Sequence, residues 1–156
     1  AMTFDVSVME EFVPLINGLT AVIASDDEIN NPRMLGDLIV KNKVDIMTST
    51  PTYVSNIIDI PQLKEAMAQI KVFDLGAEAF PPALYDKIRT VNPDVYIMNG
   101  YGPTETTISC TMKVITDSKN ITIGVPNGNV KVYIVDKENK ILPDGETGEL
   151  VVAGME

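Results

Sequence analysis

The feature that most constrains the fold is the alternation of helical segments and short apolar segments along the first 107 residues of this 156-residue chain. Apolar residues recur at helical spacing in residues 7–17, 31–42, 53–58, 61–70 and 82–91. Short apolar runs between them predict strands at residues 20–24, 44–47, 72–75 and 95–98. Apolar strands that alternate with helices are typical of an α/β fold, a parallel sheet with helices on both faces.

Helix-capping signals support two of these helices. Ser7 and Glu10 have the S-x-x-E spacing of a capping box and predict the start of the first helix. Asn31 followed by Pro32 predicts the start of the second, because asparagine favours the N-cap and proline the first helical position.

The pattern changes after residue 107. Residues 108–115, 130–135 and 149–152 are expected strands with no helix between them, and the joints are rich in Asn, Asp and Gly. This predicts a small antiparallel β extension, part of a β-barrel. We therefore expect an α/β subdomain at residues 1–107 and a β-rich extension at residues 108–156, both parts of one truncated domain.

Composition excludes several functions. Twelve basic and 22 acidic residues give a net charge of −10, which argues against nucleic-acid binding but not against a single nucleotide. Without histidine and with one cysteine, Cys110, the chain offers neither a zinc site nor a Ser-His-Asp triad. No apolar run is long enough to cross a membrane, and a lone cysteine suits a reducing compartment, so we expect a cytoplasmic protein.

The segment N-G-Y-G-P-T-E-T-T, residues 99–107, carries the strongest chemical signal. It directly follows the expected strand 95–98, and ligands of parallel sheets bind beyond the carboxyl ends of strands. Gly100 and Gly102 allow the backbone to come close to a ligand. Thr104 offers a hydroxyl to phosphate, and Glu105 a carboxylate of the kind that Mg²⁺ takes beside substrate phosphates. The same residues would also suit an ordinary glycine-rich turn with a helix cap.

This segment resembles the core motif of the adenylate-forming superfamily, in the form found in the adenylation domains of nonribosomal peptide synthetases. Three further stretches agree in order and spacing: F-D-V-S-V-M-E at residues 4–10, L-G-A-E at 75–78, and I-G-V-P to D-G-E-T-G-E-L across 123–150. The resemblance covers nearly the whole chain. It implies ATP and Mg²⁺ as cofactors and identifies the chain as the central part of the large adenylation subdomain.

The resemblance implies a role for each matching residue. Thr104 and Glu105 would be catalytic, with Glu105 holding Mg²⁺ and Thr104 contacting the α-phosphate. Tyr101 would stack on adenine, although it could instead be a packed aromatic. The implied nucleotide-binding residues are Gly76, Ala77, Glu78, Asn99, Gly100, Tyr101, Gly102 and Thr104.

For the amino-acid substrate, the resemblance implies that Asp5 pairs with the α-ammonium. Asp5 could alternatively serve only the dipole of the helix that follows it. The implied substrate-binding residues are Asp5, Val6, Met9, Thr48, Phe73, Leu75, Gly100, Ile108 and Ser109. Because most of them are apolar, we expect a mainly apolar substrate side chain.

The implied reaction joins an amino acid to AMP and passes it to the phosphopantetheine thiol of a carrier protein, beside condensation domains of a larger synthetase. A phosphate loop, a ribose-binding aspartate and a subdomain with a catalytic lysine are expected outside this chain, which alone should be inactive. Two alternatives remain. One is a D-alanine–carrier-protein ligase or an acyl- or aryl-CoA synthetase. The other is a non-catalytic binding or scaffold module.

Overall fold

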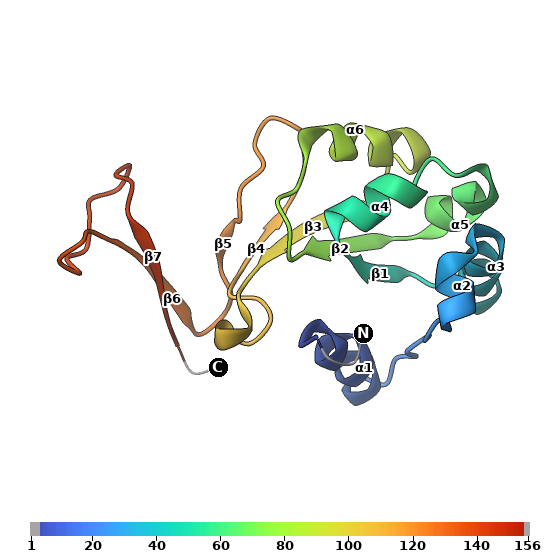
Figure 1. The fold of residues 1–156 in the computed structure, drawn as a ribbon, viewed down its shortest axis with the longest axis horizontal. Helices are drawn as coiled ribbons and strands as arrows, with labels where there is room; N and C mark the ends of the chain where they lie inside the picture. The colour runs from blue at the N-terminus through green and yellow to red at the C-terminus, as the bar shows by residue number, and fades with distance from the viewer. Residues whose placement is uncertain (1–3, 155–156) are drawn as a thin grey trace.

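A five-stranded sheet in the order β1-β2-β3-β4-β5 is the centre of the computed structural model, which describes residues 4–154 (Figure 1). β1, β2 and β3 are parallel, whereas β4 and β5 are antiparallel to their neighbours. The strands are β1 (Ile46–Ser49), β2 (Val72–Gly76), β3 (Tyr96–Tyr101), β4 (Thr111–Val114) and β5 (Val125–Pro126). The predicted α/β fold with a largely parallel sheet is confirmed.

Helices lie on both sides of this sheet. In Figure 1, α4, α5 and α6 cover one face, while α1 lies across from the other. None of the helices in the described residues has the length and apolar character needed to cross a bilayer. The helices are α1 (Val6–Ile16), α2 (Asp26–Asn30), α3 (Pro32–Asn42), α4 (Pro51–Ile57), η1 (Pro61–Leu63), α5 (Lys64–Gln69), α6 (Pro82–Val91) and η2 (Thr104–Thr106).

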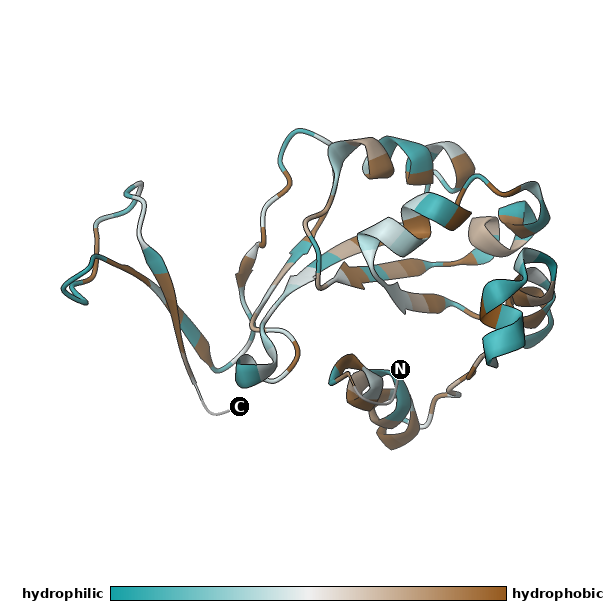
Figure 2. Ribbon diagram, viewed as in Figure 1, coloured by the Kyte–Doolittle hydropathy of each residue, from teal (hydrophilic) through white to brown (hydrophobic). Residues whose placement is uncertain are grey.

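The two faces of the sheet are buried to different degrees. Phe73 and Leu75 on β2 and Ile97 on β3 are fully buried beneath the helices, whereas Asp74 is only half-buried. Side chains alternate along a strand, so Asp74 points to the α1 side. Cover on that side is incomplete within residues 4–154, because α1 contributes no buried residue. Figure 2 shows hydrophobic positions along β1–β3 and also on the surface of α1.

The expected strand at residues 20–24 is absent. This stretch has no hydrogen-bonded strand neighbour among residues 4–154, and Ile23 is 74% exposed. An apolar run becomes a strand only where a neighbour takes up its backbone hydrogen bonds, and here it serves as the connection from α1 to α2. The prediction of a strand was therefore wrong.

The expected capping box at Ser7 and Glu10 is also wrong. Asp5 occupies the N-cap position of α1, so Ser7 lies inside the first helical turn and makes no capping hydrogen bond. The same S-x-x-E pattern forms a true capping box at Ser25 and Glu28, which starts α2. The difference is conformational: Ser25 is extended (ψ 163°), which brings its hydroxyl to the amide of Glu28.

Several expected strands have shifted ends. The strand expected at 95–98 is β3, which runs to Tyr101, so the first three residues of the 99–107 motif belong to the strand. β4 begins only at Thr111, because Thr107 and Ile108 have positive φ values of 54° and 72°, which no extended strand adopts. β1 starts at Ile46 rather than residue 44, because the preceding helix ends with Lys43 in a left-handed conformation.

A second, two-stranded sheet stands apart from the main sheet in Figure 1. Its antiparallel strands β6 (Val130–Val135) and β7 (Glu149–Gly154) pair along their full length. The predicted strand 130–135 is confirmed, and the strand predicted at 149–152 continues to Gly154. β4 pairs with β3, so the antiparallel region expected from residue 108 onward begins inside the main sheet.

Candidate functional site

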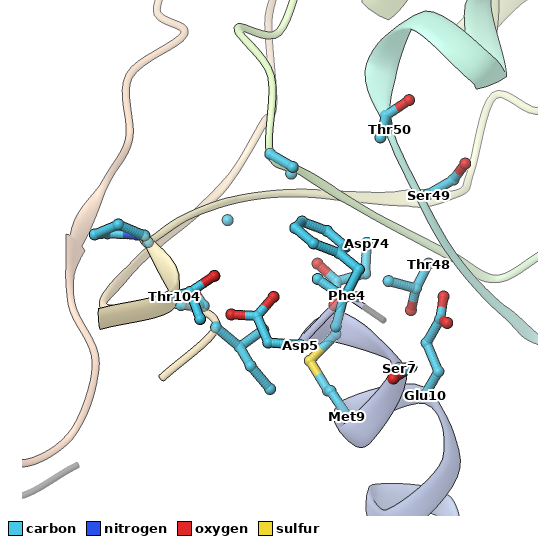
Figure 3. Close-up of a pocket in the computed structure, with 18 of the residues that line it drawn as sticks. Phe4, Asp5, Ser7, Met9, Glu10, Thr48, Ser49, Thr50, Asp74 and Thr104 are labelled. Carbon is cyan, nitrogen blue, oxygen red and sulfur yellow. The ribbon is translucent and has the colours of Figure 1, made fainter. Parts of the chain in front are cut away.

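A cavity of about 530 Å³ lies between the start of α1, the carboxyl ends of the three parallel strands and the turn that follows β3. Figure 3 shows Asp5 and Glu10 from the α1 side, Thr48 and Asp74 from the sheet, and Thr104 from η2 around this space. The carboxyl edge of a parallel sheet is the usual ligand site of an open α/β fold. The volume is within the range of small-molecule sites.

The cavity brings together residues that the sequence assigned to both substrates. Asp5 and Thr104, which lie far apart in the sequence, line the same space. Predicted residues that line it are Asp5, Val6, Met9, Thr48, Gly76, Ala77, Gly100, Gly102, Thr104, Ile108 and Ser109. The expected meeting of the segment at Asp5 with the turn after β3 is therefore present in the fold.

The structure does not place Phe73 and Leu75 in the cavity. Both are completely buried on the helix-covered face of β2. Because side chains alternate along a strand, the cavity wall on β2 is formed by Asp74 and Gly76 instead. The residues implied by the resemblance on β2 are therefore displaced by one position from those that line the cavity.

Asn99 also points away from the cavity. It is 6% exposed, and its side-chain amide donates a hydrogen bond to the carbonyl oxygen of Thr122 at 2.9 Å. It therefore holds the segment before β5 against the sheet rather than facing the space where the sequence expected adenine. Tyr101 ends β3 with 39% of its surface exposed, outside the residues that line the cavity.

Glu78 contacts a neighbouring helix. Its carboxylate accepts a hydrogen bond at 3.0 Å from the backbone N–H of Thr52, in the first turn of α4. Hydrogen bonding from the side chain and the backbone of Thr52 lowers the pKa of Glu78, because it favours the ionised carboxylate. Glu78 thus ties the loop after β2 to α4, beside the cavity rather than in its lining.

The turn after β3 is packed too tightly for side chains. A Cβ on Gly102 would lie 2.7 Å from the carbonyl oxygen of Ile108 and 2.8 Å from the nitrogen of Cys110. The backbone N–H of Cys110 also donates to the carbonyl of Tyr101 at 2.9 Å. The turn therefore folds back on residues 108–110, which presents Thr104 and Ile108 to one cavity.

Three carboxylates from the described part of the chain line the cavity, and two of them were not predicted. Glu10 and Asp74 join Asp5, and the described lining residues include no lysine or arginine. Burial raises the pKa of Asp74, and burial is also the main cause of the raised pKa of Glu10. Glu10 could have been found by spacing, because it is on the same face of a helix as Val6.

The residues fit a magnesium nucleotide better than a metal held by protein alone. No group of three or more metal-ligating side chains occurs among residues 4–154. Mg²⁺ usually takes only one or two carboxylates together with substrate phosphates and water. Glu105 is exposed in η2, directly after Thr104, and is not among the residues that line the cavity.

These features define an α/β domain with a ligand site at the carboxyl edge of its parallel strands. The whole chain, residues 1–156, matches the family described as AMP-binding enzyme, and it belongs to this family of adenylate-forming enzymes. The family resemblance predicted from residues 99–107 is confirmed.

Relatives in the family include carrier-protein ligases and peptide synthetases. The chain is 33% identical to the D-alanine–D-alanyl carrier protein ligase of Bacillus velezensis, over 97% of this chain and 31% of that protein. It is 32% identical to tyrocidine synthase 3 of Brevibacillus parabrevis, over 99% of this chain and 2% of that protein. A four-domain nonribosomal peptide synthetase solved with AMP and glycine is similar over 99% of this chain and 11% of its own, with a TM-score of 0.87 and 28% identity. The chain thus spans less than a third of each of these relatives.

Proposed function

We propose that the chain is part of an amino-acid-activating adenylation domain that forms an aminoacyl adenylate and passes the amino acid to a carrier-protein thiol. The observation that carries this proposal is the shared cavity of Asp5 and Thr104. The carboxylate of Asp5 suits an amine and the hydroxyl of Thr104 suits a phosphate, so a single site can receive an amino acid and a nucleotide together.

Asp5 is suited to bind the α-ammonium group of an amino acid. It occupies the N-cap position of α1, yet its side chain makes no capping hydrogen bond. The N-terminal end of a helix attracts negatively charged groups, so this position suits an acidic side chain. Hydrogen bonds between an ammonium and a carboxylate are among the stronger ones in proteins, so Asp5 would hold the substrate by its amine.

In the proposed reaction, a carboxylate oxygen of the amino acid forms a bond to the α-phosphorus of ATP, and the bond from that phosphorus to pyrophosphate breaks. The attacking carboxylate is already ionised at neutral pH, so no histidine is required as a base. Thr104 would orient the α-phosphate, and Glu105 would hold Mg²⁺, which offsets charge on the phosphate oxygens. The contribution of the chain is mainly positioning, which can supply a large part of a rate enhancement.

The proposed partners lie in the parent protein. They are the remainder of the adenylation domain, a carrier domain with phosphopantetheine, and condensation domains. Because the chain spans 31% of the B. velezensis ligase, we propose that residues 1–156 alone do not support amino-acid-dependent ATP–pyrophosphate exchange. Robust exchange by this piece alone would contradict that expectation.

The proposal is tested by exchange kinetics of the full-length protein that contains this chain. Asp5→Asn should lower kcat/KM for the amino acid by about 10- to 100-fold, as expected for losing a hydrogen bond between charged groups. Glu105→Gln should lower kcat by at least about 10-fold. Asp94→Asn, at an exposed site before β3, is the matched control and should leave exchange unchanged.

Two other functions have distinct outcomes in this assay. The 33% identity to the D-alanine–carrier-protein ligase supports a second candidate, which would activate D-alanine in preference to all L-amino acids. A scaffold module would show no exchange, or exchange unaffected by Glu105→Gln.

A further inference from the structure

Asp74 is a charged group in the wall of the cavity. It lies in the middle of β2, between Thr48 of β1 and Met98 of β3, on the face of the sheet that α1 overlooks. Its side chain makes no hydrogen bond and no ion pair within residues 4–154. A half-buried carboxylate without a partner is costly, because burial removes water and nothing in the described chain replaces it.

Glu10 places a second carboxylate opposite the sheet. It is one helical turn after Val6 on α1, and both residues line the cavity. Burial is the main cause of the raised pKa of Glu10 and the cause of the raised pKa of Asp74. Asp5 is already assigned to the α-ammonium in the proposed function, so two carboxylates remain for the rest of the substrate.

The remainder of the lining determines what those carboxylates can bind. Thr48 and Ser109 offer hydroxyls, Met9 and Ile108 offer apolar surface, and the lining residues within 4–154 include no lysine or arginine. An apolar amino-acid side chain would bury Asp74 further without giving it a partner, which increases the desolvation cost. A substrate whose side chain ends in a cation would form an ion pair and a charge-assisted hydrogen bond with Asp74, which would offset the desolvation cost.

We propose that Asp74 is a specificity-determining residue that selects a diamino acid, whose second ammonium binds Asp74 with Glu10 beside it. This proposal rests on the proposed function, because it assumes that the cavity receives an amino acid through Asp5. It replaces the mainly apolar substrate expected from the sequence, an expectation that used Phe73 and Leu75 in place of Asp74 and Gly76.

The test compares pairs of amino acids that differ chiefly by the second ammonium. ATP–pyrophosphate exchange of the full-length protein is measured with L-lysine against L-norleucine, and with L-ornithine against L-norvaline and the neutral L-citrulline. We expect kcat/KM for a diamino acid to exceed that for its apolar match by at least about 10-fold. Asp74→Asn should reduce this ratio by about 10- to 100-fold, while Asp74→Glu, which keeps the charge, should retain part of it. Asp94→Asn should leave the ratio unchanged.

A second readout separates this inference from the proposed function. Calorimetric binding of lysine and norleucine is measured on the same proteins without ATP. Lysine binding that depends on Asp74 but supports no exchange would overturn the adenylation proposal and support the inference. Exchange that prefers norleucine, norvaline or citrulline, or a lysine preference unaltered by Asp74→Asn, would overturn the inference and leave adenylation standing. Absence of both exchange and binding would overturn both.

Discussion

Replacing Gly102 by alanine should damage the turn that carries Thr104. The added Cβ would lie 2.7 Å from the carbonyl oxygen of Ile108, 2.7 Å from the Cα of Ser109 and 2.8 Å from the nitrogen of Cys110. All three are backbone atoms, so no side chain can rotate away. Ordinary contact begins at 3.4 Å, so the turn and residues 108–110 must separate by roughly 0.7 Å.

The size of the effect follows from this overlap. Forcing one extra carbon into a packed site typically costs about 1–3 kcal/mol. For a chain of this length, each kcal/mol lowers the Tm by about 2–4 °C, so Gly102→Ala should lower it by about 2–12 °C. The displacement also moves Thr104 relative to Asp5, and a misplacement of about 1 Å can cost about 100-fold in rate. We therefore expect kcat to fall more than stability alone would suggest.

The assay is thermal unfolding by circular dichroism together with exchange kinetics of the full-length protein, at a temperature where the variant is folded. Gly128→Ala is the matched control, because a Cβ there meets no atom within 4 Å and the residue does not have a positive φ. This control should be neutral or more stable by about 0.4–1 kcal/mol. If the two substitutions shift the Tm equally, the close packing inferred at Gly102 is refuted.

Two further predictions concern the buried Asn92, which lies at the end of α6, and Glu78, which lies beside the cavity. The side-chain amide of Asn92 donates hydrogen bonds to the carbonyls of Met67, Ala68 and Ile70. Asn92→Ala should therefore lower the free energy of unfolding, measured by urea titration, by about 1–3 kcal/mol. The control Asn42→Ala, at an exposed site, should lower it by less than about 0.5 kcal/mol. The lowered pKa of Glu78 means that its contribution to stability is complete above about pH 4.5 and is lost as the pH falls through the lowered value. The stability difference between wild type and Glu78→Gln should therefore shrink on acidification from pH 7 to 3, and a difference independent of pH would contradict the assignment.

Much of the fold could be predicted because local signals and packing agree. The helix at Pro82–Val91 has a proline at its start and a clear apolar face, and its bounds are as predicted. The strand at residues 20–24 failed because an apolar run says nothing about whether a neighbour is present to pair with it. The prediction of a capping box at Ser7 failed because the S-x-x-E pattern does not show which residue has the extended backbone conformation that an N-cap needs.

The candidate site was predicted in location but not in its charge. Motif positions at Asp5 and Thr104 lie in one cavity, since both belong to segments that meet at the carboxyl edge of the sheet. Asp74 was missed because the register of β2 was read one residue early. The raised pKa values of Asp74 and Glu10 depend on burial by distant elements, which local sequence patterns do not reveal.

The helix that carries Asp5 is the least anchored wall of the cavity. None of the α1 residues is buried, and residues 17–25, which lead from it to α2, form no strand within the part of the chain that the structure describes. Little apolar area therefore opposes its local opening, and its amides should exchange with deuterated solvent sooner than those of β2 or β3. A ligand that bridges Asp5 and the sheet would slow that exchange, so the amide exchange rate of α1 would show whether the site is occupied.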